Sequence, residues 1–289
     1  AANAAVGPSV VLSSGDRVAE GIGAFVVLGE AVTAGGNGAN VETVWAKGAN
    51  VDIAMATGAA KTDYAATLDA AALQGKRIGV LRGAQGSSPL VKDSFEQALS
   101  AMESAGAILV DIDDIDMPDG FWGKSFDVLK YEFKATLNAY LASTPDTVTT
   151  PTLADLIAFN AEHADIELAL FNQDIFEQSE GMEDLESEGY KEAVAFVQSA
   201  TRENGIDRLL AEHDVVALVA PSGPLAPRAD PVNGDVWPDW AGAGYAAAIA
   251  GYPHLTVPMG TVRGIPIGLS FMGGKDQDAA ILSLGYAYE

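Results

Sequence analysis

Continuous runs of apolar residues mark the predicted strands of this chain. A strand that is covered on both faces of a sheet is apolar along its whole length, whereas a half-exposed strand alternates with polar residues. The run at 215–220 is the clearest case, because each of its residues is apolar. Runs of this kind predict five strands of one sheet, at residues 77–81, 107–110, 215–220, 254–258 and 266–271.

Between these strands the apolar residues recur every three or four positions, which is the spacing of an amphipathic helix. Residues 91–105 have this spacing, and Gly106 ends the predicted helix. The order strand, helix, strand predicts a βαβ unit with a right-handed crossover. Residues 122–212 are predicted to be mostly helical, and a last helix is predicted at 278–286. The predicted fold class is therefore α/β, with a mixed β-sheet sandwiched between helices on both faces.

The charge balance excludes several classes of partner. The chain has 16 basic and 40 acidic residues, a net charge of −24. A surface this acidic repels the phosphate backbones of nucleic acids and anionic lipids. We therefore expect no nucleic-acid partner and no membrane partner. The sequence has no apolar run of the ~18 residues that a membrane-spanning helix needs. It also has no visible secretory signal and no cysteine, which fits a cytoplasmic protein and excludes a thiolate nucleophile.

Common catalytic and metal-binding motifs are missing from the sequence. The three histidines, at positions 163, 213 and 254, have no metal-ligand spacing, and we expect a structural role for each, for His254 a hydrogen bond. The acidic cluster at 111–116 lacks the glycine and terminal glutamate of a calcium loop. No Gly-x-Ser-x-Gly elbow accompanies the histidines. We therefore expect no bound metal ion.

The most informative residues are turns that follow strands near the C-terminal end. Pro221-Ser222-Gly223-Pro224 comes directly after the buried strand at 215–220. An Ala-Gly-Tyr-Pro turn at 250–253 leads to a Pro-Met-Gly strand end at 258–260, and Gly-Ile-Pro-Ile-Gly-Leu follows at 264–269. Because sites gather at the carboxyl ends of strands, we predict that the turns after residues 220 and 258 lie close together and border a pocket.

In order and spacing these blocks resemble the C-terminal blocks of the amidase signature family. The resemblance also includes the strand and turn at 75–86 and the Asn-Gly-Ile-Asp at 204–207, and covers about residues 60–289. It implies a single amidase-like domain over 1–289. In that domain residues 1–60, of which 25 are Ala or Gly, form a degenerate or incomplete catalytic-core segment. Residues 61–289 are its C-terminal part, with a helical substrate-pocket region at about 120–212.

The resemblance implies hydrolysis of a carboxamide or other linear amide C–N bond, without metal or organic cofactor. In the family a Ser-cisSer-Lys triad does this chemistry. The lysine deprotonates the bridging serine, which activates the nucleophilic serine, while amides of a glycine loop hold the oxyanion. A serine hydroxyl needs such a base because it is otherwise a poor nucleophile. The partner is then a small-molecule amide substrate, and a homodimer is left open as the assembly.

The family's catalytic residues map only partly onto this chain. Ser13-Ser14-Gly15 resembles the element that carries the bridging serine, so Ser13 and Ser14 are the catalytic candidates; the alternative is an ordinary loop pair. Asn37 stands where the nucleophilic serine belongs. The catalytic lysine belongs upstream of Ser13, and Lys47 and Lys61 lie on the wrong side of it. The resemblance assigns the oxyanion loop to Ala34, Gly35, Gly36 and Asn37.

Aromatic residues at helical spacing in the middle of the chain are candidates to line the substrate pocket, or else they are core residues. A non-catalytic binding or scaffold protein that keeps the fold without the triad is the alternative to a hydrolase. An unrelated α/β protein is the second alternative. The predicted substrate-binding residues are Phe121, Trp122, Phe126, Tyr131 and Pro221.

Overall fold

The chain forms two compact units. The computed structural model describes residues 10–14, 24–28, 63–145, 147–230, 232–234, 236 and 238–289. The first unit, here called the sheet unit, comprises Ala1–Asp116, Thr201–Asp230 and Gly234–Glu289. The second, the helical unit, comprises Met117–Ala200 and Pro231–Asn233.

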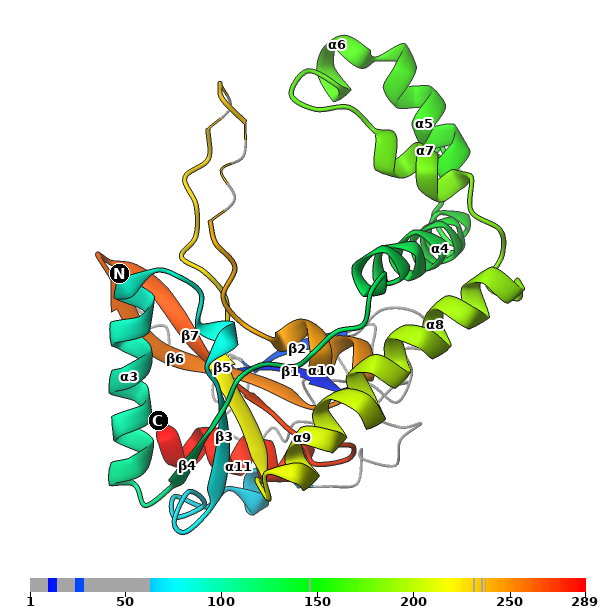
Figure 1. Ribbon diagram of the computed structural model, residues 1–289. Helices are drawn as coiled ribbons and strands as arrows, with labels where there is room; N and C mark the ends of the chain where they lie inside the picture. The colour runs from blue at the N-terminus through cyan, green and yellow to red at the C-terminus, as the bar shows by residue number, and fades with distance from the viewer. Residues whose placement is uncertain are drawn as a thin grey trace. The chain divides into compact units, whose positions relative to one another are not determined.

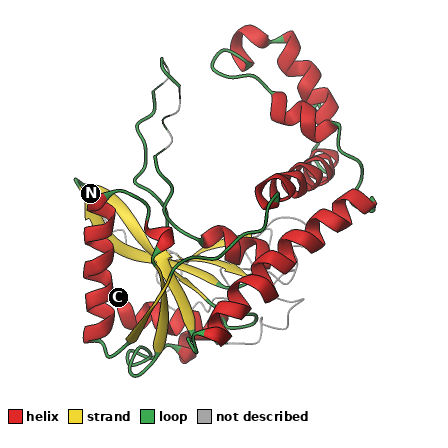
Figure 2. Cartoon of the chain, in the orientation of Figure 1, coloured by secondary structure: helices red, strands yellow, loops and turns green. Residues whose placement is uncertain are grey.

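The described residues of the sheet unit form one seven-stranded sheet in the order β2-β1-β6-β7-β5-β3-β4 (Figures 1 and 2). All five strands predicted from the sequence belong to it, so the prediction of one mixed sheet is confirmed. The strands are β1 (Val10–Ser14), β2 (Ala24–Leu28), β3 (Arg77–Leu81), β4 (Ile108–Ile112), β5 (Ala217–Pro221), β6 (His254–Val262) and β7 (Ile265–Met272).

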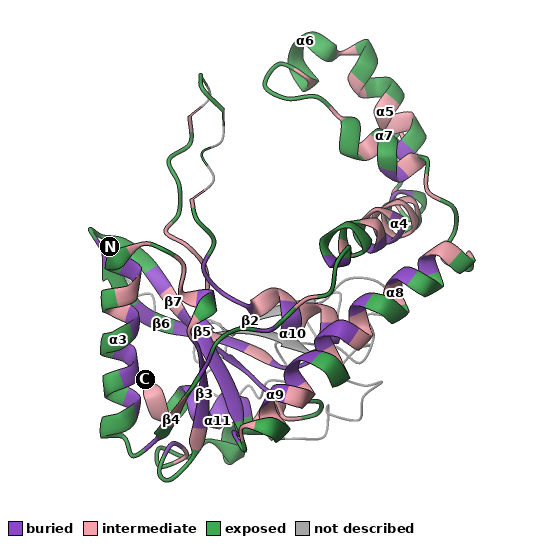
Figure 3. Cartoon of the chain, in the orientation of Figure 1, coloured by how far each residue is buried: buried purple, intermediate pink, exposed green. Residues whose placement is uncertain are grey.

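Strands β3, β4 and β5 are parallel, and the strands on the other side of β5 are antiparallel. β3 pairs in parallel with both β4 and β5. β7 pairs antiparallel with β5 and with β6. Helix α3 (Pro89–Ser104) connects β3 to β4, which confirms the βαβ unit. β3 and β5 are buried along almost their whole length, as their continuous apolar runs predict (Figure 3).

Strands β6 and β7 are longer than predicted because they form one hairpin. Their connection is a two-residue turn in which Arg263 and Gly264 have φ values of 52° and 83°. A turn with two positive φ values matches the twist of the flanking strands. The sequence predicted that this strand ends at Pro258, but β6 continues to Val262. Pro258 pairs with Gly268 beside a register shift between Pro258 and Gly260, and such an irregularity accommodates a proline within a sheet.

Helices cover both faces of the sheet. On one face α3 and α11 (Asp278–Tyr288) pack against β6 and β7, around a core that includes Phe95, Leu255 and Phe271. Alternate residues of β6 point to the opposite face, where α10 (Gly244–Ala250) lies against β1, β6 and β7. The described residues of this unit also form the helical elements η4 (Ala65–Thr67), η5 (Gly83–Gln85), η6 (Arg202–Ile206) and α9 (Asp207–Glu212).

The helical unit holds most of the chain between β4 and β5, as the apolar spacing predicts. Its helices are α4 (Phe121–Ala142), α5 (Leu153–Glu162), α6 (Ala164–Glu167), α7 (Asp174–Glu180) and α8 (Glu188–Thr201), of which α8 ends at the boundary of the sheet unit. The ammonium of Lys134 on α4 donates to the carbonyls of Glu180 at 2.6 Å and Met182 at 2.9 Å, which ties α4 to the end of α7. Among the described residues, no helix combines the length and apolar character that crossing a membrane demands.

Candidate functional site

The carboxyl ends of the parallel strands meet at one edge of the sheet, where sites of α/β proteins gather. The segment after β3 contacts the segment that leads into α10, because the amide of Gly242 donates to the carbonyl of Ala84 at 2.6 Å. Ser222 follows β5 directly, and its amide donates to the carbonyl of Gly268 on β7 at 2.7 Å. This edge therefore brings turn residues from distant parts of the sequence together.

Four polar side chains form a connected network beside the end of β5, here called the hydroxyl cluster: Ser222, His254, Thr256 and Ser270. The Nε2 atom of His254 lies 2.7 Å from the Oγ of Ser270. The hydroxyl of Ser270 donates to the Oγ of Ser222 at 2.9 Å. The hydroxyl of Ser222 in turn donates to the Oγ1 of Thr256 at 3.2 Å.

The hydroxyl cluster is closely enclosed by glycines. A Cβ atom on Gly268 would lie 2.7 Å from the Cγ2 of Thr256 and 2.8 Å from the Oγ of Ser222. A Cβ on Gly244 would overlap the ring of His254. Gly242 has a φ of 99°, and its Cβ would lie 2.8 Å from the carbonyl oxygen of Pro221. Glycine at these positions lets the backbone approach the cluster from two sides.

Burial controls the charge of His254. Its ring is largely removed from water, and the loss of hydration lowers its pKa from 6.5 to about 4. The imidazole is therefore neutral at pH 7. A neutral imidazole has one nitrogen that donates and one that accepts a hydrogen bond, so Nε2 has either role toward Ser270.

The structure places the predicted catalytic serines on a strand that pairs with β6. Ser13 and Ser14 are the last residues of β1, and β1 pairs antiparallel with β6 so that Ser13 is the register partner of His254. The predicted oxyanion loop, Ala34, Gly35, Gly36 and Asn37, lies outside the described residues.

The predicted proximity of the two strand-end turns is confirmed in part. Pro221 is the last, buried residue of β5 and pairs with Leu269. Ser222 bonds to Gly268, and Gly268 pairs with Pro258. The residues after 220 and around 258 therefore meet at β7, although β6 continues through Pro258 and has no turn there. The prediction that they border a pocket stays a prediction.

The four predicted aromatic substrate residues divide into two buried and two exposed side chains on α4. Phe121 is buried and contacts the ring of Trp122 edge-on, with 5.1 Å between centroids, whereas Trp122 is 59% exposed. Tyr131 is buried against Tyr190. Phe126 is 41% exposed, and the ammonium of Lys130 lies 5.2 Å from its ring centroid. Burial favours a core role for Phe121 and Tyr131, and their assignment to a substrate pocket stays a prediction.

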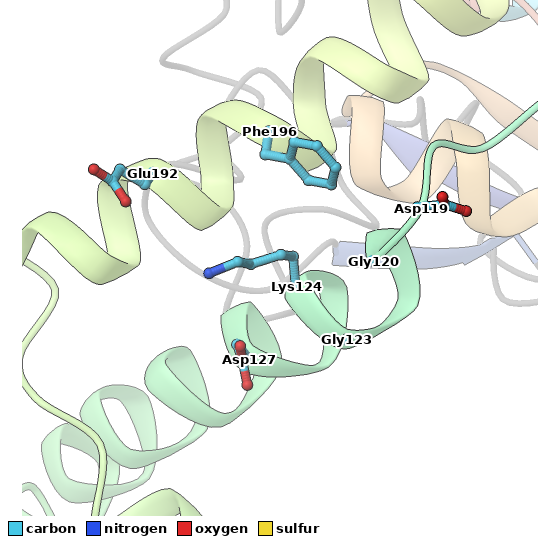
Figure 4. Close-up of a pocket in the computed structure, with 7 residues that line it drawn as sticks. All are labelled: Asp119, Gly120, Gly123, Lys124, Asp127, Glu192 and Phe196. Carbon is cyan, nitrogen blue, oxygen red and sulfur yellow. The ribbon is translucent and has the colours of Figure 1, made fainter.

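A cavity of about 490 Å³ lies between α4 and α8 in the helical unit. Figure 4 shows Lys124 of α4 extending across it toward α8, which contributes Glu192 and Phe196. Asp127 on its rim is 3.1 Å from the ammonium of Lys130. The four aromatic residues predicted to bind substrate are not part of this lining. The lining residues are Asp119, Gly120, Gly123, Lys124, Asp127, Glu192 and Phe196.

From the sequence we expected His254 to make a structural hydrogen bond, and Ser222, Thr256 and Ser270 were not predicted to be site residues. A signal was present, because the hairpin register pairs Thr256 with Ser270 and places His254 two residues away on the same face. Within the described segments, no group of His, Cys, Asp or Glu side chains is arranged to hold a metal ion.

Comparison with known proteins identifies the class of protein that has this fold. Residues 50–282 match the family model described as Amidase. The chain is 30% identical over 257 residues to a putative amidase of Arthroderma benhamiae and 29% identical over 236 residues to a probable amidase of Arabidopsis thaliana. Both alignments cover 78% of this chain but only 39% and 40% of the relatives. The chain therefore spans about two fifths of the length of these relatives.

Solved structures agree with this assignment. The native peptide amidase from Stenotrophomonas maltophilia is 36% identical, with a TM-score of 0.66 over 79% of this chain and 45% of that one. A peptide amidase in complex with the competitive inhibitor chymostatin is 37% identical, with a TM-score of 0.69 over 79% of this chain and 46% of that one. An amidase family protein from Bacillus anthracis is 26% identical, with a TM-score of 0.63 over 83% of this chain and 43% of that one. The chain belongs to the amidase family.

Proposed function

We propose that this chain belongs to a hydrolase that cleaves a carboxamide or other linear amide C–N bond. The match of residues 50–282 to the amidase family carries the proposal. The α/β sheet supports it, because it matches solved amidases at 26–37% identity over about four fifths of the chain. Residues 1–289 act in this proposal as one amidase-like domain in the cytoplasm.

The proposed mechanism is the Ser-cisSer-Lys mechanism, with Ser13 as the bridging serine. The position of β1 supports this assignment, because its pairing with β6 holds Ser13 within the central sheet. Backbone amides of Ala34, Gly35 and Gly36 would face the oxyanion. Amides aimed at the developing negative charge lower the barrier to acyl transfer.

Asn37 stands at the position of the nucleophilic serine, and its amide nitrogen is neither basic nor an adequate attacking group. Neither Lys47 nor Lys61 lies on the side of Ser13 from which the family's lysine comes. Loss of a member of a serine-hydrolase triad leaves only the contributions of substrate binding and the oxyanion hole. The alternative function is therefore a catalytically inactive amidase-like binding or scaffold protein.

The substrate class that we propose is a peptide that carries a carboxamide group. Two peptide amidase structures, 36% and 37% identical to this chain, support it. The cavity between α4 and α8 adds a binding surface with both charged and aromatic groups, Lys124, Glu192 and Phe196. Charged and polar groups around an apolar wall are typical of sites that orient a small ligand.

The test begins with the gene upstream of the codon for Ala1. If that region encodes a lysine-bearing segment, the longer product is expressed beside this chain and both are assayed for ammonia release from C-terminal peptide amides. The hydrolase proposal expects turnover by the longer product. Binding of the amide by a longer product that has the lysine but no turnover would support the scaffold alternative instead.

A further inference from the structure

We propose that Ser222 is a second nucleophilic serine, activated through Ser270 by His254, and that it accepts acyl groups from esters with good leaving groups. The proposal concerns the hydroxyl cluster alone. It does not rest on Ser13, on Asn37 or on the proposed amide hydrolysis.

The three groups are connected in the order base, hydroxyl, hydroxyl. The distance from Nε2 of His254 to Oγ of Ser270 is 2.7 Å, and that from Ser270 Oγ to Ser222 Oγ is 2.9 Å. Both lie within the range of hydrogen bonds that transfer protons. A nucleophile within hydrogen-bond reach of a base is the arrangement that activated serines share.

Proton transfer toward His254 requires that two hydroxyl hydrogens rotate and that the neutral imidazole holds its proton on Nδ1, which leaves Nε2 as the acceptor. A serine hydroxyl has one hydrogen, which turns about the C–O bond, and two acceptor lone pairs. In the structure Ser270 donates to Ser222, and Ser222 donates to Thr256. In the reverse direction Ser222 donates to Ser270, and Ser270 donates to Nε2 of the neutral imidazole.

The two serines differ in their access to solvent, which decides their roles. Ser270 is completely buried, so it exchanges its proton only with its neighbours in the cluster. Ser222 is only partly buried and stands at the carboxyl end of β5. Ser222 is therefore the group that a reagent reaches, and Ser270 is the positioning residue.

The chemical step balances without a cofactor. The Oγ of Ser222 attacks the ester carbonyl while its proton passes to Ser270 and the proton of Ser270 passes to Nε2 of His254. The carbonyl–oxygen bond to the leaving group breaks, the good leaving group departs as its anion, and the imidazolium keeps the proton that came from Ser222. Water then attacks the acyl carbonyl and gives up one proton to solvent, and the bond to the Ser222 oxygen breaks. That oxygen regains its proton from the imidazolium through Ser270, which releases the carboxylic acid and restores the neutral cluster.

The weak basicity of His254 limits the substrate class. A general base is most effective when its pKa is close to the working pH, and burial holds the pKa of His254 at about 4. Esters with good leaving groups need less help from a base than amides do. The cluster is therefore expected to react with activated esters and fluorophosphonates, and not to hydrolyse amides at a useful rate.

The test uses the full chain, a fluorophosphonate probe and peptide mass mapping. Ser222 is expected to be labelled at least about tenfold faster than Ser104. Ser104 is a suitable internal reference because it is exposed on α3 and its hydroxyl donates to the carbonyl of Ser100. Labelling of Ser222 at the rate of Ser104, or no labelling of Ser222, would overturn the proposal.

Variants separate a relay from a merely structural hydrogen bond. His254→Gln keeps a hydrogen-bonding amide but removes the base, so it is expected to slow labelling of Ser222 about tenfold or more. Ser270→Ala is expected to have the same effect, and Ser104→Ala none. Circular dichroism identifies any variant that fails to fold, and the labelling rates of the folded variants then decide whether the relay exists. If both cluster variants unfold, the rate ratio of Ser222 to Ser104 in the unaltered chain decides. Unchanged labelling in a folded His254→Gln protein would contradict the relay.

Discussion

His254 Nε2 lies 2.7 Å from the Oγ of Ser270, although these residues are 16 positions apart in the sequence. The β6–β7 hairpin creates this contact, since its register pairs Thr256 with Ser270 and aligns His254 with the same face. The pair links a titratable group to a chain of hydroxyls at the strand-end edge of the sheet.

The first prediction concerns the pH dependence of folding. In the unfolded chain His254 titrates near pKa 6.5, and in the folded chain near 4. As the pH falls, the unfolded chain therefore binds the proton first, so the folded state is destabilised between about pH 6.5 and 4. The contribution of His254 is complete above that window, and its loss reaches up to about 3 kcal/mol. Urea unfolding of the unaltered chain and of His254→Gln, at pH 7 and pH 4, measures this difference. Equal pH dependence of the two proteins would show that His254 is not buried in the neutral form.

The second prediction concerns the close packing at Gly268. Gly268→Ala places a methyl group 2.7 Å from the Cγ2 of Thr256 and 2.8 Å from the Oγ of Ser222. Overpacking of this kind is expected to lower the free energy of unfolding by about 1–3 kcal/mol. Gly223→Ala is the matched control, because its Cβ meets nothing within 4 Å and a change within about 0.5 kcal/mol is expected. Urea denaturation of the two variants tests this, and equal stabilities would contradict the packing described.

The third prediction concerns the buried carboxylate of the helical unit. The hydroxyl of Tyr190 donates to the Oε1 of Glu132 at 2.8 Å, and Glu132 is only 5% exposed. Burial and the nearby carboxylate raise the pKa of Tyr190, so it stays protonated and remains a donor. Tyr190→Phe removes a hydrogen bond to a charged group and is expected to cost about 1.5–3 kcal/mol. Tyr140→Phe is the control, because Tyr140 is 66% exposed and little change is expected. The free energies of unfolding of the two variants decide, and similar values would show that the Glu132 contact contributes little.

The strands that run through the sheet interior could be predicted because burial on both faces makes them apolar throughout. β3 has the predicted bounds, and β5 begins at Ala217 and ends at Pro221. β6 was predicted too short because Pro258 reads as a strand breaker. The register shift beside Pro258 and the Arg263–Gly264 turn overcome that local preference. This is tertiary pairing, which no local pattern contains.

The hydroxyl cluster could not be predicted because each of its members is an ordinary polar residue in sequence. Ser222 and Ser270 are 48 positions apart, and only the pairing of β5 with β7 brings them together. The family resemblance gave the fold class and the predicted catalytic serines without this network. The assignments to Ala34, Gly35, Gly36 and Asn37 rest on that resemblance and fall outside the described residues.

Amide turnover by the chain with the printed sequence tests the central claim most directly. The measurement is ammonia release from simple aliphatic and aromatic amides and from C-terminal peptide amides, with mass mapping of any serine adduct. The account predicts little or no turnover, because the family resemblance puts Asn37 at the nucleophile's position and residues 1–12 of the printed sequence contain no lysine. Robust turnover with an adduct at Ser13 or Ser14 would show that the assignment of the first 60 residues is wrong. Robust turnover without any serine adduct would contradict the serine mechanism itself.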